Sequence, residues 1–599
     1  MDEQPYVDMN QQETRDLADT LGMIANQSRE MVSGFLREHY GIDYGLQIDP
    51  LNIGGAFFDL TTRLMTGPAV LMQAQMSLWR NYMDLWQSTT RRMMGEDMPA
   101  AIAPEPHDHR FDHQAWEDNQ LFDYIKQSYL LTARWLHSTA HNLQGENRQE
   151  TEVLDFFTRQ FVDAMAPSNF LFTNPEVQRA TIESSGQNLL KGLEHLLHNL
   201  SLRGGRLEDS MADDTAFVLG QNLACTPGKV IFENELMQLL QYSPTTETVA
   251  KRPVLVVPPW MNKYYVLDLR QENSFIRWMV DQGLTVFCIS WVNPDERLAQ
   301  KTFENYMIEG PVAALGAIRK ICGKVAVNCV GYCLGGTLLS VAQAYLAAKK
   351  QPLIHSASFI TTLTDFSDPG ELAVFIDEEQ VTLLEKEMAR DGGSDGTGMI
   401  ATLRPLRAND LIWSFVVDNY LLGKEPFPVD LHYWNEDATR VPAVMHAFYL
   451  RRMYLENLLS QPGGITLDAV PIDLARIETP IFMVAAKEDH LVPWRAAYNA
   501  TELFKGPVHF VLTAGGHVSG VLNPPDRAKY PYWTNSRTAR HPETWFRNAK
   551  KHDGSWWDDW AGWLRNHRGR EVPAREPGSG PLKASGDAPG SYIAVKLKS

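Results

Sequence analysis

The stretch Val325-Ala326-Val327-Asn328-Cys329-Val330-Gly331-Tyr332-Cys333-Leu334-Gly335-Gly336-Thr337 decides the fold of this chain. It begins as a short apolar strand, turns through a Gly-x-Cys-x-Gly sequence and continues as a helix expected from Thr337 to about Lys349. This order is that of a nucleophile elbow, in which the central side chain is held in a strained conformation above the end of a sheet. Glycines on both sides let the strand and the helix approach closely. The pattern predicts that Cys333 is a nucleophile; the alternative is a buried, inert cysteine in an ordinary loop.

From about residue 228 onward, apolar β-branched runs alternate with helical segments. The runs are 229–232, 253–257, 284–290, 324–330, 354–361, 480–485 and 507–513. Strands rich in Val and Ile that alternate with helices are typical of a mostly parallel sheet covered on both faces. Residues 365–472 interrupt this alternation and carry many aromatic residues and prolines, so we interpret them as a cap inserted over the sheet. The sequence therefore predicts an α/β fold.

The first part of the chain reads instead as helices. We expect an all-helical domain over residues 1–205 and the α/β domain over 206–599, with the polar stretch 203–214 at the boundary. One apolar stripe between Pro68 and Met94 consists of Met72, Met76, Trp79, Met83 and Trp86. Steps of three and four residues indicate a helix that faces the core or another subunit. The alternative is attachment to a hydrophobic surface, which suits large and adaptable side chains.

Composition limits the partners and the compartment. The net charge of −18 disfavours nonspecific nucleic-acid binding, because the phosphate backbone would be repelled. The five cysteines are odd in number and include no Cys-x-x-Cys pair, which favours a reducing cytoplasm over a disulfide scaffold. The acidic N-terminus does not read as a signal peptide. No uninterrupted apolar run approaches the length of a transmembrane helix, about 18 residues, so we expect no transmembrane segment.

The loop at residues 98–114 contains the metal-ligating residue types His107, Asp108, His109 and His113. A metal site needs a fixed set of ligands, and we find no second cluster elsewhere to complete one. We therefore favour a solvated loop and expect no metal.

A thiol nucleophile needs a base to remove its proton, and the base needs a group that orients it. In the α/β-hydrolase layout the chain order is nucleophile, acid, histidine, and the acid and the histidine each follow a late strand. Asp489 follows the run at 480–485, and His517 follows the next run and two glycines. We therefore predict Cys333, Asp489 and His517 as the catalytic set. His490 and Glu488 are secondary candidates, because in an extended segment their side chains point away from that of Asp489.

An oxyanion hole requires backbone N–H donors. The residue after the nucleophile, Leu334, supplies one in this layout. The second comes from the loop after an early strand, here Pro258-Pro259-Trp260-Met261-Asn262-Lys263. The two prolines have no N–H to donate. We therefore expect Met261 to be the second donor.

Several of these stretches together resemble one family, the class I polyhydroxyalkanoate synthases, over essentially the whole chain. The matching stretches are Gly331–Gly336, Pro258–Tyr265, Ser290–Asp295, Glu488–Trp494, Gly515–Gly520 and the N-terminal block Lys126–Leu131. Val292 departs from the pattern, since many members carry a basic residue there; the departure leaves the catalytic set intact.

The resemblance implies an acyltransferase that polymerises (R)-3-hydroxyacyl-CoA thioesters into an intracellular polyester and releases CoA. By the family pattern Cys333 carries the acyl chain, His517 deprotonates it, and Asp489 orients His517 or helps to activate the 3-hydroxyl of the incoming group. It also implies an α/β-hydrolase core with a mobile cap, an N-terminal helical domain, a homodimer, and a cytoplasmic location on polyester granules with granule-associated proteins. The residues Tyr332 and Leu334 resemble the short-chain class, so we expect 3-hydroxybutyryl-CoA as the main monomer and no cofactor.

Two other functions fit part of the sequence. A cysteine esterase, lactonase or polyester depolymerase would use the same three residues, and only the length, the N-terminal domain and the motif set favour the synthase. A granule-coating or scaffold protein would use the Met- and Trp-rich helix, but it would not explain an intact set of Cys333, Asp489 and His517.

Overall fold

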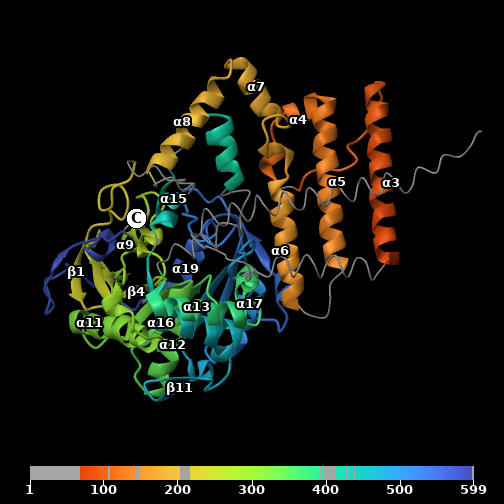
Figure 1. Ribbon diagram of the computed structural model, residues 1–599. Coiled ribbons are helices and arrows are strands. Elements are labelled where there is room, and N and C mark those ends of the chain that lie inside the picture. Colours follow the sequence, from red (N-terminus) through yellow and green to blue (C-terminus); the bar gives the residue numbers. More distant parts are fainter. Residues whose placement is uncertain are drawn as a thin grey trace, which may run out of the picture.

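The computed structural model describes residues 68–105, 108–142, 148–202, 216–391, 393–394, 412–425, 429–437 and 439–596. A helical N-terminal part stands beside a large mixed sheet that carries helices on both faces (Figure 1). The expected domain boundary at residues 205–206 lies outside the described residues.

Six parallel strands form the centre of the sheet. Their order is β5 (Val286–Trp291), β4 (Val254–Val257), β6 (Val327–Tyr332), β7 (Ile354–Ile360), β12 (Ile481–Ala486) and β13 (Val508–Thr513). Each of these strands falls on one of the apolar runs, as does β1 (Gly228–Glu233), so the predicted α/β fold is confirmed.

Antiparallel strands extend both edges of the sheet. Next to β5 lie β2 (Met237–Tyr242), β1 and β17 (Gly586–Asp587), and next to β13 lie β14 (Tyr532–Thr534) and β15 (Lys550–His552). The strand of the C-terminal tail is therefore the short β17, whereas the final described residues form the 3-10 turn η14 (Tyr592–Ala594). Short antiparallel pairs also join β3 (Thr248–Ala250) to β16 (Glu571–Pro573) and β8 (Gly393–Ser394) to β9 (Val441–Pro442).

The two faces of the sheet belong to two separate apolar clusters, because alternate residues of a strand point to opposite faces. Along β4, Val254 and Val256 belong to one cluster, and Leu255 and Val257 belong to the other. Helices α9 (Phe275–Asp281) and α19 (Trp556–Arg565) cover the first face. The second face is covered by α10 (Phe303–Met307), α11 (Ala313–Cys322), α12 (Leu334–Ala348), α17 (Trp494–Asn499) and α18 (Pro542–Arg547).

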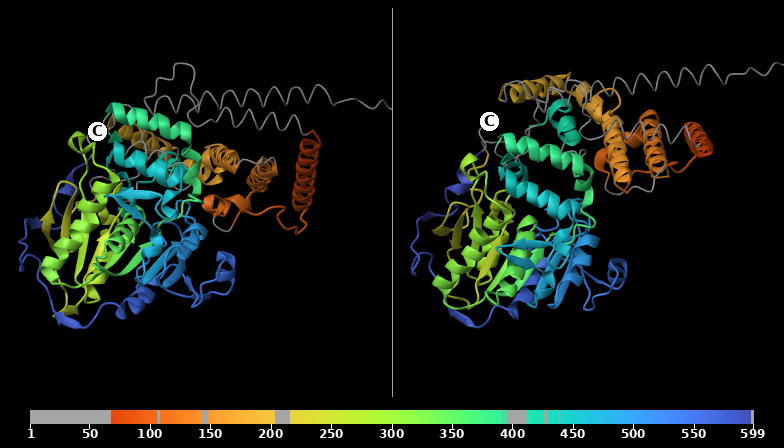
Figure 2. Two further views of the ribbon diagram at one scale, coloured as in Figure 1. Left: turned by 90° about the horizontal axis from the view of Figure 1, so that it is seen from below. Right: turned by 60° about the horizontal axis from the view of Figure 1, so that its bottom comes forward.

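The chain between β7 and β12 forms the cap. Its described elements are η6 (Gly370–Phe375), α13 (Glu378–Asp391), η9 (Val416–Leu421), α15 (Asp430–Glu436), α16 (Ala443–Tyr449), η10 (Leu450–Leu455) and the hairpin of β10 (Ile465–Leu467) and β11 (Val470–Ile472). The cap helices lie over the sheet on the side of the N-terminal helices (Figure 2).

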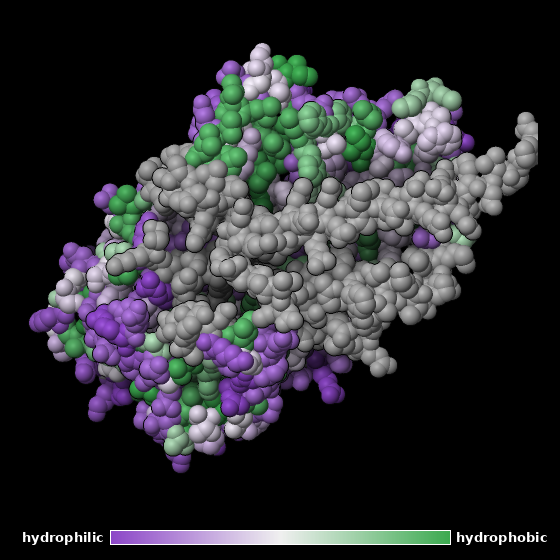
Figure 3. All heavy atoms as spheres, in the orientation of Figure 1, coloured by the Kyte–Doolittle hydropathy of each residue, from purple (hydrophilic) through white to green (hydrophobic). Residues whose placement is uncertain are grey.

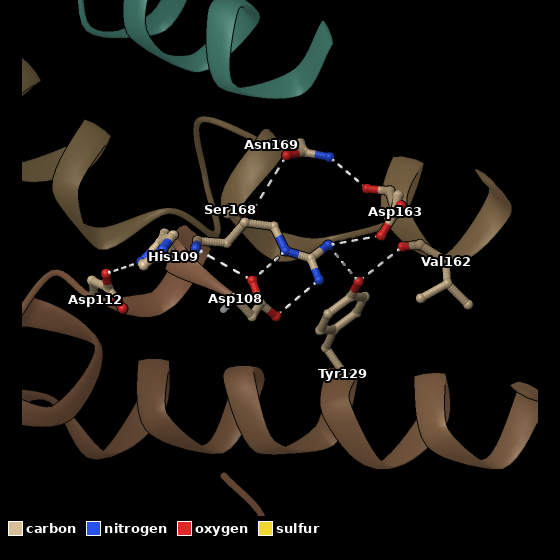
Figure 4. A network of polar contacts seen from close by, with 9 residues as sticks. Asp108, His109, Asp112, Tyr129, Val162, Asp163, Ser168 and Asn169 are labelled. Carbon is tan, nitrogen blue, oxygen red and sulfur yellow. Dashed lines mark hydrogen bonds and ion pairs between the residues drawn. The ribbon is translucent and has the colours of Figure 1, made fainter. Parts of the chain in front are cut away.

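The N-terminal part consists of α3 (Pro68–Met93), α4 (Ala115–Asp118), α5 (Gln120–Asn142), α6 (Arg148–Ala164), α7 (Pro175–Glu183) and α8 (Gln187–Leu202). A partly buried ionic network joins the loop before α4 to α5 and α6 (Figure 4). The Arg110 guanidinium donates to Asp108, to the Tyr129 hydroxyl and to Asp163, and Tyr129 donates to the Val162 carbonyl. The Asp108 carboxylate thus pairs with Arg110, and its neighbour His109 contacts Asp112.

Most of the described Met and Trp side chains of the α3 stripe point away from the described core. Met76, Trp79 and Trp86 are 59%, 69% and 57% exposed, Met93 extends the same stripe, and Met83 is partly buried, whereas the side chain of Met72 lies outside the described part of the chain. The opposite side of α3 packs on α5 through Leu85 and a hydrogen bond between the hydroxyls of Tyr82 and Thr132. This leaves the stripe available to another subunit or to a hydrophobic surface, the two remaining interpretations.

The N-terminal helices hold the cap at two places. On α6, Arg159 donates to Glu371 of η6 at 2.8 Å, and Phe156 packs edge-on against Phe375. On α8, the Asn188 amide donates to the Leu421 carbonyl. A Cβ at Gly192 of α8 would lie only 1.9 Å from the Tyr420 carbonyl oxygen, so α8 and η9 touch through their backbones.

Candidate active site

Cys333 lies between β6 and α12 with φ 51° and ψ −123°. L-residues other than glycine rarely adopt a positive φ, and the strain persists only where the surroundings fix the backbone. The Cys333 amide donates to the Ile360 carbonyl, while the Cys333 carbonyl accepts from the amides of Gly336 and Thr337. The helix begins at Leu334, immediately after the nucleophile and earlier than the predicted Thr337.

The glycines of the elbow are explained by three close approaches of backbone and side chain. A Cβ at Gly331 would lie 2.4 Å from the Gly336 Cα, where the strand and the helix cross. A Cβ at Gly335 would lie 2.0 Å from the Val257 carbonyl oxygen, and one at Gly336 would lie 2.0 Å from the Thr362 hydroxyl. Side chains at these positions would push the helix away from the sheet and release the turn.

Asp489 lies in the turn after β12 and its side chain has no solvent exposure. Its Oδ1 accepts from the amides of Leu491 and Val492, both at 2.9 Å. Its Oδ2 contacts His517 Nδ1 at 2.7 Å. The neighbouring Glu488 is exposed, which agrees with its lower rank as a candidate acid. The Asp489 carboxylate is thus fixed on both oxygens and oriented toward one imidazole nitrogen.

His517 follows β13 after a turn in which Gly515 has φ 85°. The imidazole is buried, lies 5.7 Å from the Tyr332 ring, and is hydrogen-bonded to Cys333 as well as to Asp489. Since Nδ1 is engaged by the carboxylate, Nε2 is the nitrogen left for the thiol. The structure therefore brings Cys333, His517 and Asp489 together in the predicted order.

The neighbouring charges determine whether His517, the predicted base, carries a proton. Burial lowers the pKa of His517, but Coulomb attraction to Asp489 and Cys333, with hydrogen bonds to both, outweighs burial and raises that pKa well above its ordinary value. A protonated His517 is stabilised by the buried Asp489 carboxylate beside it, so this imidazole is suited to accept a proton.

The two candidate oxyanion donors lie on segments that touch. Leu334 is the first residue of α12, where helical amides have no partner within the helix. The Gly335 contact with Val257 and Pro258 presses that helix end against the loop that contains Met261. Among the described residues, neither the Leu334 amide nor the Met261 amide donates to a carbonyl outside a helix or strand. Their assignment as donors stays a prediction.

Aromatic side chains of the cap lie close to the nucleophile, and the sequence did not show which ones. Tyr449 and Tyr454 are close enough for the Cys333 charge to act on both hydroxyls, and burial raises the pKa of each. Their rings lie 5.4 Å apart, and Phe366 packs edge-on against both. Trp260 of the loop after β4 lies 5.3 Å from Tyr449. The aromatic richness of 365–472 was the available signal, but spacing alone did not show which rings face Cys333.

The remaining predicted positions have other surroundings. His490 follows Asp489 in the chain, and its carbonyl accepts from the Glu371 amide of the cap. His113 accepts from the Ala115 amide, and His107 lies outside the described residues. In the described ranges no three His, Cys, Asp or Glu side chains are grouped as metal ligands. Of the helices that the structure describes, none combines the length and apolar character needed to cross a bilayer.

Comparison with known proteins gives consistent results. Residues 107–279 match the family described as poly-beta-hydroxybutyrate polymerase (PhaC) N-terminus, and residues 272–524 match the alpha/beta hydrolase fold. The chain is 43% identical over 590 residues to a poly(3-hydroxyalkanoate) polymerase of Methylorubrum extorquens, covering 97% of each chain. It is 44% identical to the poly(3-hydroxyalkanoate) polymerase subunit PhaC of Rhizobium meliloti, covering 89% of this chain and 87% of that one. The corresponding subunit of Cupriavidus necator is 42% identical, with 90% of each chain covered.

We expect Gly335→Ala to destabilise the α/β part of the protein, because the added methyl group meets the Val257 carbonyl. Overpacking of this kind costs about 1–3 kcal/mol, and thermal unfolding followed by circular dichroism measures it. Gly316→Ala is the matched control: this helical glycine has open space around its Cβ position, so alanine should stabilise by about 0.5–1 kcal/mol. Equal stability of Gly335→Ala and the unchanged protein would contradict the close approach of α12 and β4.

We expect His517 to remain protonated above pH 6.5, about the ordinary pKa of histidine. A raised folded-state pKa means that protonation stabilises the fold fully below about pH 6.5 and that this contribution is lost as pH rises through the folded-state value. Nuclear magnetic resonance titration of labelled histidines measures it, and Asp489→Asn should lower the His517 pKa. His446 is an internal control, because burial lowers its pKa to about 4. A His517 side chain that is already neutral at about pH 6.5 would contradict the raised pKa.

Proposed function

This chain belongs to the poly(3-hydroxyalkanoate) polymerases, and from that membership we propose that it builds its polymer on Cys333 from (R)-3-hydroxyacyl-CoA, mainly 3-hydroxybutyryl-CoA. It is an acyltransferase with an α/β-hydrolase fold. The cysteine-bound intermediate is best supported by the arrangement of three residues. Cys333 has a strained backbone, His517 lies beside it, and the fully buried Asp489 carboxylate contacts His517. The catalytic residues of the proposal are these three.

The first step loads Cys333. His517 Nε2 takes the proton of the thiol, and the Cys333 sulfur attacks the thioester carbonyl of the substrate. The carbonyl oxygen becomes an oxyanion, which the amides of Leu334 and Met261 would stabilise. The carbon–sulfur bond to CoA then breaks, and the departing CoA thiolate recovers the proton from His517. The products are a thioester on Cys333 and free CoA.

The second step forms the ester. The 3-hydroxyl of a second hydroxyacyl group attacks the Cys333 thioester while His517 accepts the hydroxyl proton, and Asp489 orients His517 or assists this activation. The bond from carbon to Cys333 breaks, and the thiolate leaves against the His517 imidazolium. The chain has then grown by one unit on CoA and returns to Cys333 by the loading step, with loss of CoA.

Water must be kept from the thioester, because hydrolysis would end the chain. The aromatic side chains Tyr449 and Tyr454 close to Cys333, with Phe366 packed against both rings, support a function in acyl transfer to an alcohol. A cysteine hydrolase with the same three residues is the second candidate. Cys333, His517 and Asp489 would serve a synthase and a hydrolase equally well, so the reaction product distinguishes the two enzymes.

The choice of monomer rests on the two residues that flank the nucleophile. Tyr332 is 1% exposed and packs beside His517, and Leu334 begins α12. Bulky residues at both positions favour a short acyl group beside Cys333. CoA is the leaving group of the substrate, and we propose no further cofactor and no metal.

We assign residues 1–205 to a helical domain that attaches the enzyme to polyester granules in the cytoplasm and supports a homodimer. Residues 206–599 form the catalytic domain, and residues 365–472 cap its active site. Two exposed apolar surfaces support attachment. One is the stripe of α3. The other gathers over α7 and α8 (Figure 3) and includes Phe172, Ile182, Leu190, Leu193 and Leu197. Granule-associated proteins are further expected partners, whereas the net charge of −18 disfavours nucleic acid.

The test of the proposed function is the product that the purified protein forms from 3-hydroxybutyryl-CoA. Release of CoA together with insoluble polyester supports the proposal. Release of CoA with only free 3-hydroxybutyrate would show that the same residues serve a hydrolase. No CoA release from this substrate would contradict the proposed monomer, and a matched assay with longer 3-hydroxyacyl-CoA thioesters would then identify the acyl group used.

We predict that Asp489→Asn slows steady-state CoA release at least tenfold, since orientation and protonation of His517 depend on that carboxylate, with general base catalysis worth about 10²–10⁴-fold. The variant should still take up a first acyl group on Cys333. Glu488→Gln is the matched control, because this adjacent carboxylate is exposed and should leave turnover unchanged. Unchanged turnover in Asp489→Asn would remove Asp489 from the catalytic set.

A further inference from the structure

Lys263 lies in the core, although lysine is rarely buried there. It follows the loop 258–262 and is 5% exposed, and its side chain is 3% exposed. The ammonium donates to Asp437 Oδ1 at 2.6 Å and to the Ile593 carbonyl at 2.7 Å. Asp437 Oδ2 accepts from the Tyr265 hydroxyl at 2.9 Å, so both carboxylate oxygens are engaged. Both charges of this pair are satisfied within the protein.

The three groups come from three distant parts of the chain. Lys263 belongs to the loop after β4, Asp437 ends the cap helix α15, and Ile593 lies in η14 of the C-terminal tail. The cap also holds the main chain of Lys263, because the Trp434 indole donates to the Lys263 carbonyl at 2.8 Å. The tail is held in turn, since Gln238 accepts from the amides of Ser591 and Tyr592. The full set of contacts of Lys263 is therefore made only when cap and tail are both docked on the loop.

The energetics of a buried ion pair make it costly to separate Lys263 from Asp437. Two charges taken out of water gain little net stability from each other, whereas removal of one partner leaves an unpaired buried charge that costs several kcal/mol, about 3–5. Burial lowers the pKa of the Lys263 ammonium, and Asp437 opposes that shift. Two apolar residues would pack at least as well as the pair, so its use here favours a role in fixing geometry.

We propose that Lys263 is a positioning residue for acyl transfer: through Asp437 of the cap and Ile593 of the tail it fixes the loop 258–263, and so holds the Met261 amide where it completes the oxyanion hole. Met261 is two residues before Lys263, and its neighbour Trp260 packs against Tyr449 of the cap. Misplacement of such a donor by about 1 Å lowers a rate by about a hundredfold. This inference rests on the proposed function and adds to it the coupling of cap, tail and oxyanion loop.

The test compares Lys263→Met with the double variant Lys263→Met/Asp437→Leu in the full-length chain. The single variant leaves Asp437 buried and unpaired, and the double variant removes both charges. We expect both to lose about a hundredfold in kcat for CoA release, with KM for 3-hydroxybutyryl-CoA changed less than threefold, about the spread expected when ground-state binding is intact. The double variant should recover the midpoint of thermal unfolding without recovering kcat. Alkylation of Cys333 by iodoacetamide needs the thiolate but no oxyanion donor, so its rate should stay unchanged in both.

Lys301→Met is the matched control, because Lys301 pairs with Glu235 and Glu309, which belong neither to the cap nor to the C-terminal tail. It should change kcat little. Recovery of kcat with stability in the double variant would overturn the proposal, as would a normal kcat in either variant or parallel loss of alkylation and acyl transfer. If Lys263→Met does not fold, the double variant decides alone by the same readings. Absence of CoA release by the unchanged enzyme would instead count against the proposed function.

Discussion

The site depends on the close crossing of β6 and α12. Because glycine at 331, 335 and 336 leaves no side chain between strand and helix, Cys333 is held at φ 51° between them. The same contact presses the start of α12 against Val257 and Pro258, which brings Leu334 next to the Met261 loop. One backbone constraint thus determines the direction of the nucleophile and the neighbourhood of both candidate oxyanion donors. The strain is sustained by the parallel sheet, whose Ile360 carbonyl accepts the Cys333 amide.

Two buried ionic arrangements are built around this constraint. In one, the Asp489 carboxylate raises the pKa of His517, and in the proposed reaction His517 exchanges its proton with the thiol and the substrate. In the other, Lys263 and Asp437 do not exchange a proton in the proposed reaction, and their burial joins the loop to the cap. Burial strengthens the electrostatic interactions of both, because the surrounding protein screens charges less than water does. The cap therefore contributes aromatic side chains close to Cys333 and a carboxylate that pairs with Lys263 of the loop 258–263.

The sequence predicted the parts whose signals are local. Glycines around Cys333, an acid after one strand and a histidine after the next are patterns of a few residues, and the geometry brings the three side chains together. The edge strands β14 and β15 were not anticipated, since three residues each are too few to form an apolar run, and β2 was not recognised either. Helical spacing showed that α3 has an apolar stripe but not what faces it, and the stripe is exposed. The proximity of Tyr449 to Cys333 and the ion pair of Lys263 with Asp437 join distant segments, so no local pattern could show them.

The central claim is that the polymer grows on Cys333, and rapid acid quenching followed by mass spectrometry of peptides tests it most directly. Cys329 lies four residues earlier, on β6, and is 1% exposed, so it serves as an internal control thiol. After brief mixing with 3-hydroxybutyryl-CoA, we predict a hydroxybutyryl adduct, or a short oligomer of it, on Cys333 and none on Cys329. Polymer formation with Cys333 unmodified at every quench time, or with the acyl chain on another side chain, would contradict the account.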